Sequence, residues 1–577
     1  MSNINDFGKV YSSDILIIGG SIAGLSAAIK AKECNEELDI LVVDKGTIGW
    51  SGQSTKAGNG IVASAPDQPI EEFAEFLVKN NGDYLNDQEF LLDYLSTNLE
   101  AVEQLGNWGV KVSKNLDGSV KLFPQYNNLW SNAGIELYNC QSLRKHALKI
   151  GVRLLSRVQI FELLTNGGRV VGGIGFNLDC GFDVDNMGCH IFRAKAIGIA
   201  TQGAHFKKMG GMFMAYGNGM AAAYRVGAYM RNAEFATEPD VVSRAVYTPV
   251  YGSYNIIHNN LGENISAKYA PNTEECKTEL CLGMYKEVQE GRGPCYADLR
   301  NPDPVRINVG AQGHENDQRI FPDKHEWSEH VEKKSAKYGR PLTDTPEVTI
   351  RFSLQAECVR VDRDYRTNVE GLWAPGKISD KGSAYFGFVR GDGLGYAAQS
   401  GIRAGDSMAR YAASAEFADI STDQVNELKE KIYAPLHRDT NRKPSEIFNK
   451  IEGFAYHIDK VLVKTDESLK NVLADIGEMY KIVPELTADD GHTLAKCHEA
   501  ADSLLALEMI YRASLMRTES RGGKYRHNRA DYPNRDDKNW LKWICIKRGE
   551  NGDMELFTED IPMDRYPFKP EGYVGSN

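Results

Sequence analysis

The hydrophobic pattern near the start of the chain predicts a buried strand that turns directly into a helix. Apolar residues fill positions 15–18, two glycines interrupt them, and helix-favouring Ala and Leu follow Gly24. A second apolar run, at 40–43, ends in Asp44, twenty residues after Gly24. Free N–H groups at a helix start can face a pyrophosphate, and an acid at the next strand end can hold ribose hydroxyls. We therefore predict a βα dinucleotide-binding unit.

The glycines of this unit have separate predicted roles. Gly19 permits the tight turn, and Gly24 lets the helix pack close to the strand. Ser21 stands where the pattern G-x-G-x-x-G has its second glycine. The backbone can therefore approach the phosphates less freely, but the serine hydroxyl can donate a hydrogen bond to them. A glycine turn followed by a strand-end Asp also occurs in ordinary α/β domains, so this unit alone leaves the function open.

A loop at 46–64 is dense in Gly, Ser and Thr. Glycine permits close approach of the backbone, and hydroxyls and amides supply hydrogen bonds, so the loop suits ligand binding. As a plain surface connection it would be long for a compact domain.

Further along, the periodicity alternates between helix and strand. Apolar positions at helical spacing predict helices within 66–109, and the region 152–171 predicts β structure with a hairpin at 166–168. From about 416 to 520 the pattern is helical, with amphipathic spans at 425–432 and 494–516.

Composition narrows the functional classes. The 577 residues carry a formal charge of −12 with Lys and Arg dispersed, which argues against nucleic acid as a partner. No apolar run approaches the roughly 20 residues that span a bilayer, and the N-terminus lacks a signal-peptide pattern, so we expect a cytoplasmic protein. The ten cysteines include no C-x-x-C pair, so we predict no metal site, and any iron–sulfur cluster belongs to another subunit.

Three later blocks carry a specific resemblance. Residues 200–203 are similar to an A-T-G-G turn, and 215–228 resemble T-G-D-G-x-A-M-A-x-R-A-G-A with Asn218 in place of Asp. Residues 367–377 resemble T-x-V-x-G-L-Y-A-A-G-E, with Lys377 where an acid usually stands. Together with the first unit, these blocks follow the order of the FAD-dependent fumarate reductase and succinate dehydrogenase flavoprotein superfamily. The resemblance covers about 12–545, and the R-A-D-Y-P wording at 529–533 is nearest to the adenylylsulfate reductase alpha-subunit branch.

The resemblance implies an α/β fold. It consists of a Rossmann-like FAD-binding domain with an inserted α+β capping domain, followed by a helical domain and a C-terminal tail. The expected boundaries are 1–240 and 349–415 for the two parts of the FAD-binding domain, 241–348 for the capping domain or lid, 416–525 for the helical domain, and 526–577 for the tail.

The same resemblance implies FAD as the cofactor. Some members of the superfamily bond the flavin to a histidine of the loop, but no histidine precedes His146 here, so we expect non-covalent FAD. The residues predicted to bind it are Gly19, Gly20, Ser21, Ala23, Gly24, Asp44, Lys45, Ser51, Gly52, Ser54, Thr55, Gly58, Asn59, Gly60, Ala200, Thr201, Gln202, Gly203, Asn218, Gly376, Lys377, Ala398 and Ser400.

The substrate residues of a fumarate reductase are missing. The histidine of a Q-F-H-P-T segment is absent from 236–240, and the segment 351–357, which includes Gln355, lacks a second substrate histidine. Glu279 and its neighbours occupy the stretch where a proton-shuttling arginine would follow Y-A-P. Clamping two carboxylates beside a flavin and delivering a proton needs such groups, so we predict that this is not a typical fumarate reductase.

The remaining cations provide the candidate catalytic residues. These are Arg390, directly before a helix of small residues that is predicted to face the flavin, together with Arg351 and Lys277. We interpret three isolated histidines as packed or exposed residues without a catalytic partner: His205, His437 and His457.

The resulting hypothesis is a flavoprotein subunit of an oxidoreductase. It passes electrons between FAD, a small polar or anionic substrate and an iron–sulfur or ferredoxin-like subunit. Membership of a peripheral membrane complex is compatible with this hypothesis. The alternatives are an electron-transfer flavoprotein without substrate chemistry of its own and an adenylylsulfate-reductase-like enzyme. The retained lid landmarks at 269–272 and 291–300 favour an enzyme, because a lid excludes water from reacting groups.

Overall fold

The computed structural model describes most of the chain. The residues described are 4–55, 60–125, 128–179, 188–206, 215–244, 256–270, 277–298, 345–380, 389, 391–523 and 525–575, with the side chain of Lys277 left out.

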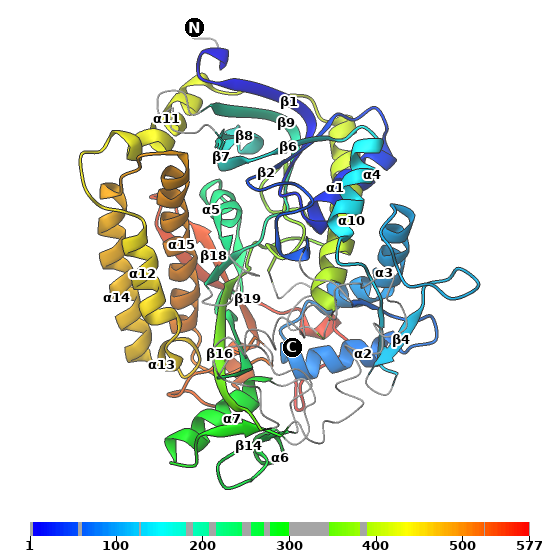
Figure 1. Cartoon of the computed structure of the whole chain (residues 1–577), viewed down its shortest axis with the longest axis vertical. Helices are drawn as coiled ribbons and strands as arrows, with labels where there is room; N and C mark the ends of the chain where they lie inside the picture. The colour runs from blue at the N-terminus through cyan, green and yellow to red at the C-terminus, as the bar shows by residue number, and fades with distance from the viewer. Residues whose placement is uncertain are drawn as a thin grey trace.

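A seven-stranded sheet forms the centre of the nucleotide-binding region, at the top of Figure 1. Its order is β6-β2-β1-β9-β8-β7, and β17 also pairs with β9. Strands β6, β2, β1, β9 and β17 run parallel, whereas β8 and β7 extend the sheet antiparallel. The apolar run of β1 is 0–8% exposed, as expected for a strand covered on both faces. The strands span β1 Lys9–Ile18, β2 Ile40–Asp44, β6 Arg153–Ser156, β7 Val158–Asn166, β8 Arg169–Asn177, β9 Cys189–Ile199 and β17 Leu372–Trp373.

Two long helices pack against each other beside this sheet. They are α1 (Ile22–Cys34) and α10 (Asp392–Ser414), with α4 (Asn139–Lys149) next to α1. A Cβ atom on Gly401 or Gly405 of α10 would lie 2.3 or 2.4 Å from a backbone oxygen of α1. The small residues of α10 therefore let the two backbones touch, which brings a segment near residue 400 onto the first helix of the chain.

Between β2 and α4 the chain forms a small layer of strands and helices. A three-stranded sheet of order β3-β5-β4 packs with two helices there. The elements are η2 Gln53–Thr55, β3 Ile61–Ala63, α2 Ile70–Leu77, η3 Val78–Gly82, α3 Gln88–Asn107, β4 Leu122–Gln125 and β5 Trp130–Ala133.

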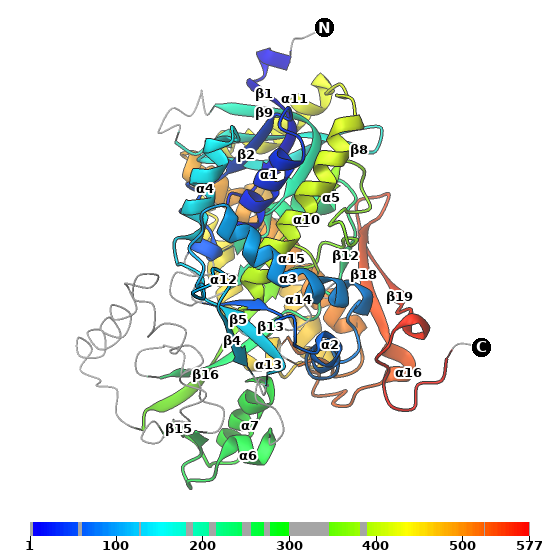
Figure 2. The same cartoon turned by 90° about the vertical axis from the view of Figure 1, so that its right-hand side faces the viewer.

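A second large sheet joins the nucleotide-binding region to the lid, which lies at the bottom of Figure 2. Its central strand, β16, pairs with β10, β13 and β15, and β10 and β15 pair in turn with β11 and β14. The predicted domain boundary at 348/349 falls inside β16 and stays a prediction. The elements are β10 Ala204–Phe206, β11 Ala215–Tyr216, α5 Asn218–Arg225, β13 Thr237–Ser243, β14 Ile257–His258, α6 Ile265–Tyr269, α7 Lys277–Gln289, β15 Cys295–Ala297 and β16 Glu347–Ala356.

The helical region lies on the left of Figure 1, where α12, α14 and α15 stand side by side. Helix α15 is buried along most of its length. This region confirms the helical periodicity of 416–520. Its elements are α11 Thr422–Tyr433, η5 Ala434–His437, α12 Ser445–Ala455, α13 Ile458–Val461, α14 Asp466–Ile482, η6 Val483–Glu485 and α15 Gly491–Met516.

The C-terminal tail returns to the body of the molecule. Its hairpin pairs with β12 near residue 230, and the remaining short elements are η1, α16 and η7. Their bounds are η1 Ile4–Asp6, β12 Met230–Arg231, α16 Asp537–Trp540, β18 Lys542–Arg548, β19 Met554–Asp560 and η7 Met563–Arg565.

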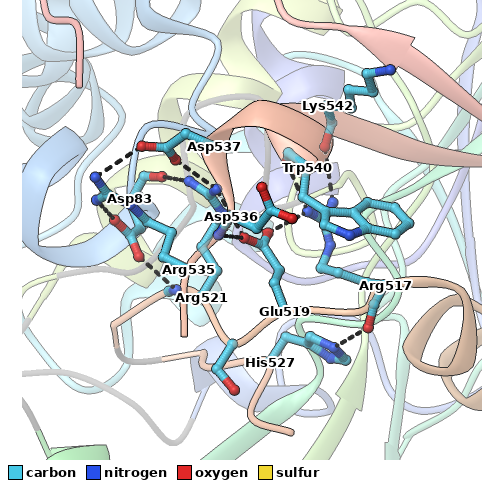
Figure 3. Close-up of polar contacts among 12 residues, drawn as sticks. Asp83, Arg517, Glu519, Arg521, His527, Arg535, Asp536, Asp537, Trp540 and Lys542 are labelled. Carbon is cyan, nitrogen blue, oxygen red and sulfur yellow. Dashed lines mark hydrogen bonds and ion pairs between the residues drawn. The ribbon is translucent and has the colours of Figure 1, made fainter. Parts of the chain in front are cut away.

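A buried ionic network fixes the segment that leads from α15 into this tail (Figure 3). The Glu519 carboxylate accepts hydrogen bonds from Arg517 at 2.8 Å and from Arg521 at 2.6 and 2.9 Å, and all three side chains are 0% exposed. Arg521 also donates to the backbone oxygen of Asp83 and to Asp537. Because each buried charge is paired, the network ties the tail to the loop after η3 without leaving a bare ion.

The α/β class with a nucleotide-binding region and a helical C-terminal region is thus confirmed, whereas the division into domains stays a prediction.

Candidate cofactor and substrate site

The turn between β1 and α1 requires the glycines that the sequence places there. Gly19 has φ +112°, and a Cβ on it would lie 2.7 Å from the Ala200 oxygen at the end of β9. A Cβ on Gly24 would lie 1.9 Å from the Gly19 oxygen. The turn is therefore closed to larger side chains, and it brings the carboxyl ends of β1 and β9 together.

Asp44 holds this turn against the loop that follows β2. One carboxylate oxygen accepts a hydrogen bond from the Gly20 N–H and the other from the Gly46 N–H, each at 2.6 Å. The acid predicted to bind ribose therefore also shapes the backbone around the site.

The loop contributes a second support to the start of α1. The Ser54 hydroxyl accepts a hydrogen bond from the Ile22 N–H at 3.1 Å and lies 3.2 Å from the Cys140 sulfur. Burial raises the pKa of the Cys140 thiol to about 12, so it stays protonated. Sequence reasoning missed Cys140, because a single cysteine in a helix carries no motif.

Other predicted loop residues lie at the same turn. A Cβ on Gly52 would contact the Cβ of Ser21 at 3.2 Å, and the Thr55 hydroxyl donates to the Gly52 oxygen at 2.7 Å. Ser51 accepts from the Thr47 N–H at 2.8 Å. Gly58 and Asn59 lie outside the described residues, and Gly60 stands next to Gly391 at the start of α10.

The hydroxyl group of Thr201 indicates whether the residues of this site fit a bound cofactor. The Thr201 oxygen is buried at the end of β9 and makes no hydrogen bond within the described part of the chain. A Cβ on Gly219 would lie 2.3 Å from it, so protein atoms crowd one side. Gln202 donates to Gln53 of the loop. A polar ligand held between this turn and the loop satisfies such a hydroxyl, so the residues fit FAD.

The second segment predicted to bind FAD meets the first at the start of α1. Gly376 has φ +86°, and a Cβ on it would lie 2.9 Å from the Cβ of Ala23. Its N–H donates to the Ser400 hydroxyl at 2.9 Å, and Ala398 is buried in the same stretch of α10. Residues near 20, 376 and 400 thus converge.

Two acids of helix α15 contact side chains that are predicted to bind the cofactor. Asn218 donates to Asp502 at 2.6 Å, and Lys45 forms an ion pair with Glu499 at 3.0 Å. An amide at position 218 can donate to Asp502, which an ionised carboxylate there could not do.

Strand β16 and its neighbour β13 carry a polar face formed by the segments 351–357 and 236–240, where the resemblance to the superfamily leads us to expect substrate histidines. Alternation along a strand puts Ser353 and Gln355 on one side, with Glu238 of β13 opposite Ser353. The Gln355 amide donates to Glu238 at 2.8 Å and to Ser353 at 2.9 Å, and Tyr525, directly before the tail, donates to Gln355 at 3.4 Å. A carboxylate and an amide therefore meet between the two segments in which the expected histidines are absent.

The predicted catalytic cations lie in different surroundings. Arg351 forms an ion pair with Asp240 at 2.9 Å, on the same face of β16 as Gln355. Lys277 is the first residue of α7, and its side chain is outside the description, as is Arg390.

Arg526 is a cation that sequence reasoning missed. It extends from the tail to the lid helix α7, where it donates to Glu279 at 3.3 Å, and it also donates to the Gly522 oxygen. The second Glu279 oxygen is buried and makes no hydrogen bond among the described residues. The two residues are far apart in sequence, so no local pattern signals their contact.

His205 is a packed residue, as interpreted, but the structure gives it an ionic partner. Its Nε2 lies 2.8 Å from the Glu357 carboxylate, both side chains are 0% exposed, and the same oxygen of Glu357 lies 3.5 Å from the Lys377 ammonium. Long-range pairing of β10 with β16 produces this contact, so the histidine has a partner that the sequence alone conceals.

The glycine-tight βα turn, the strand-end acid and the converging loops define a dinucleotide-binding flavoprotein. Two family models match the chain. One, described as an FAD binding domain, covers residues 14–243, and the other, described as the C-terminal part of the fumarate reductase flavoprotein, covers 459–573. The chain is an FAD-binding oxidoreductase that is similar to the flavoprotein subunits of fumarate reductases.

Individual relatives are similar along nearly the whole chain. The 8-methylmenaquinol:fumarate reductase flavoprotein subunit of Wolinella succinogenes is 25% identical over 596 residues, covering 98% of this chain and 93% of the relative. The FrdA chain of E. coli quinol fumarate reductase superposes with a TM-score of 0.81 at 20% identity, covering 99% of this chain and all of that one. Adenylylsulfate reductase from Archaeoglobus fulgidus superposes with a TM-score of 0.75 at 18% identity, covering 96% of both chains. The two solved structures show the shared fold.

Neither a membrane-spanning helix nor a metal-binding cluster occurs among the described residues. Within the described ranges, every helix is too short or too polar to span a bilayer. The same residues include no group of three or more histidine, cysteine or carboxylate side chains that could hold a metal ion.

Proposed function

We propose that the chain is the flavoprotein subunit of an oxidoreductase that acts on a small polar or anionic substrate other than fumarate. The substrate site lies on the polar face of β16, between the FAD region, the lid helix α7 and the tail. FAD supplies the two-electron chemistry when bound. The residues of this chain bind and orient the substrate and exclude water from it.

One contact carries the proposal: the Gln355 amide donates to Glu238 at 2.8 Å. A carboxylate at this place repels a dicarboxylate instead of clamping it, and an amide neither carries a charge nor delivers a proton. A substrate that offers hydrogen-bond donors to Glu238 fits this pair better. The observation therefore supports an activity different from that named for the fumarate reductase relatives.

Cations near this face bind a polar or anionic part of the substrate. We retain Arg390, Arg351 and Lys277 as candidates and add Arg526, whose guanidinium reaches the lid at Glu279. Arg351 is already neutralised by Asp240, so it contributes orientation more than net charge. The Arg526–Glu279 ion pair joins the tail to the lid helix. When Arg526 changes its partner from Glu279 to the substrate, substrate binding becomes coupled to the position of the lid.

We further propose that FAD is held without a covalent bond. The loop contains no histidine, and the nearby Cys140 thiol is protonated and buried, so it is a poor nucleophile. Acid precipitation followed by absorbance of the supernatant tests this. Release of the yellow colour is expected, and colour retained in the pellet contradicts the proposal.

The electron partner in this proposal is an iron–sulfur or ferredoxin-like subunit. The sequence contains no cluster motif, and the Wolinella relative is named as a flavoprotein subunit. Co-purification from the native source tests it. A native protein that runs alone and reacts quickly with NAD(P)H or oxygen would contradict this partner.

The substrate class is tested with reduced viologen as electron donor under anaerobic conditions. We expect fumarate to be reduced far below an ordinary enzymic rate, and one or more small polar acceptors to oxidise the dye faster. Rapid turnover of fumarate refutes the proposal. Rapid electron exchange with a ferredoxin-like partner, but with no acceptor of any class, identifies an electron-transfer flavoprotein instead.

A further inference from the structure

Three ionisable side chains, His205, Glu357 and Lys377, meet where β10 pairs with the end of β16. Glu357 accepts from His205 at 2.8 Å and pairs with Lys377 at 3.5 Å through the same oxygen. The His205 and Glu357 side chains are 0% exposed and that of Lys377 is 13% exposed. We call these residues the buried triad.

The buried triad adjoins two of the segments that are predicted to bind the cofactor. Lys377 directly follows Gly376, whose backbone contacts the start of α1. His205 lies two residues after Gly203, where an added Cβ would be 1.8 Å from the Ala356 oxygen at the end of β16. The triad therefore stands between the turn after β9 and the loop that leads to α10.

A stabilising role alone does not explain this arrangement. Removing charges from water is costly, and a buried ion pair commonly contributes no more than an apolar pair of the same size. At position 377, moreover, the resemblance to the superfamily calls for an acid, and this chain has a cation with its counter-charge on Glu357. The charge at position 377 thus has the opposite sign to the one that the resemblance implies.

We propose that the buried triad sets the reduction potential of the bound FAD. Lys377 places a positive charge beside the cofactor, and Glu357 anchors the ammonium and His205 while moderating that charge. Reduction adds negative charge to the flavin, and a fixed charge nearby acts strongly where water is excluded. The triad residues are positioning and charge-setting groups. The inference rests on FAD binding and not on the choice of substrate.

Removing each charge separately makes a direct test, because the two changes act in opposite directions. The midpoint potential of the FAD-loaded protein is measured by spectroelectrochemical titration in Lys377→Met, Glu357→Gln and the double variant. We expect a lower potential for Lys377→Met, a higher one for Glu357→Gln, and an intermediate one when both charges are absent. Lys377→Arg keeps the cation and is expected to retain the wild-type potential.

A matched control removes a different cation close in sequence. Arg360 stands three residues after Glu357 but pairs with Glu559 of β19 at 2.7 Å and is 34% exposed. We expect Arg360→Gln to leave the potential unchanged. If Glu357→Gln fails to fold, the comparison of Lys377→Met with Lys377→Arg decides alone.

The proposal is overturned if the single variants keep the wild-type potential or shift it in the same direction. It is also overturned if Lys377→Arg shifts the potential as much as Lys377→Met does. Because the titration needs no substrate, a wrong substrate assignment leaves its result intact, and a wrong triad assignment leaves the substrate assay intact.

Discussion

Arg526 of the C-terminal tail donates a hydrogen bond to Glu279 of the lid helix α7 at 3.3 Å. Glu279 lies in the stretch where the sequence lacks the arginine of the fumarate reductases, so a cation reaches this region from a segment about 250 positions later in the chain. The side chains are 22% and 29% exposed, and an ion pair of that exposure contributes at most about 1 kcal/mol to stability.

We therefore expect Arg526→Gln to change function more than stability. The loss of a substrate cation lowers kcat/KM on the order of a hundredfold, for the acceptor that turns over in the viologen assay. Urea denaturation is expected to show a change below about 1 kcal/mol. Lys286→Gln on the same helix, which removes an exposed pair with Glu290, is the control. Equal kinetic effects of both variants would remove Arg526 from the site.

We expect alanine to have opposite effects at two glycines, one in the close-packed βα turn and one on the surface of α14. Gly24→Ala places a Cβ 1.9 Å from a backbone oxygen, so we expect loss of FAD binding or of folding. Gly477→Ala on the exposed side of α14 meets nothing within 4 Å, and it should stabilise the protein by about 0.5–1 kcal/mol. FAD absorbance and thermal unfolding report the two outcomes. A Gly24→Ala protein with full FAD content would refute the close-packed turn.

We expect the folded state to lose stability in acid because of the buried imidazole of His527. The imidazole is buried against Lys464 and the Arg517 backbone, and desolvation with the nearby cations Lys464, Arg517 and Arg529 holds its pKa well below 6.5. The native histidine stays neutral, whereas the unfolded chain takes up a proton below about pH 6.5. Stability is therefore lost as pH falls from there, by up to on the order of 1 kcal/mol per pH unit for this group.

The measurement is the free energy of unfolding in urea at several pH values between 7 and 5. We expect a shallower loss toward acid in His527→Gln than in the wild type. The exposed His492→Gln is the control and should keep the wild-type slope. Identical slopes for His527→Gln and the wild type would contradict a buried neutral imidazole.

The network in Figure 3 predicts that one carboxylate holds the tail. Glu519→Gln leaves the buried guanidinium groups of Arg517 and Arg521 without their counter-charge, and breaking such a pair costs roughly 3–5 kcal/mol. Glu478→Gln removes only an exposed contact with Lys481 and should cost about 0.5 kcal/mol or less. Urea midpoints compare them. A loss below about 1 kcal/mol for Glu519→Gln would show that the network contributes little.

Local sequence patterns were enough to predict the nucleotide-binding unit. The apolar run of β1, the glycines at 19 and 24 and the acid at the end of β2 act within a few residues of one another, so backbone sterics alone determine the turn. The order of the later blocks then indicated FAD and the superfamily. The predicted role of each individual cofactor and catalytic residue stays a prediction.

The polar face of the candidate substrate site could not be predicted in this way. Gln355 and Glu238 are 117 positions apart, and His205 meets Glu357 only because β10 pairs with β16. Spacing along the chain carries no information about such pairs, since their register depends on the whole sheet.

By itself, the sequence determined where the chain turns, which segments are buried and which cofactor fits, because these follow from contacts between near neighbours. Only the tertiary structure decided which charges face one another. The tail brings Arg526 to Glu279, and β16 brings Glu357 between His205 and Lys377. The free energy of a charge depends on the burial and the partners that packing creates, and residues far apart in the chain supply both.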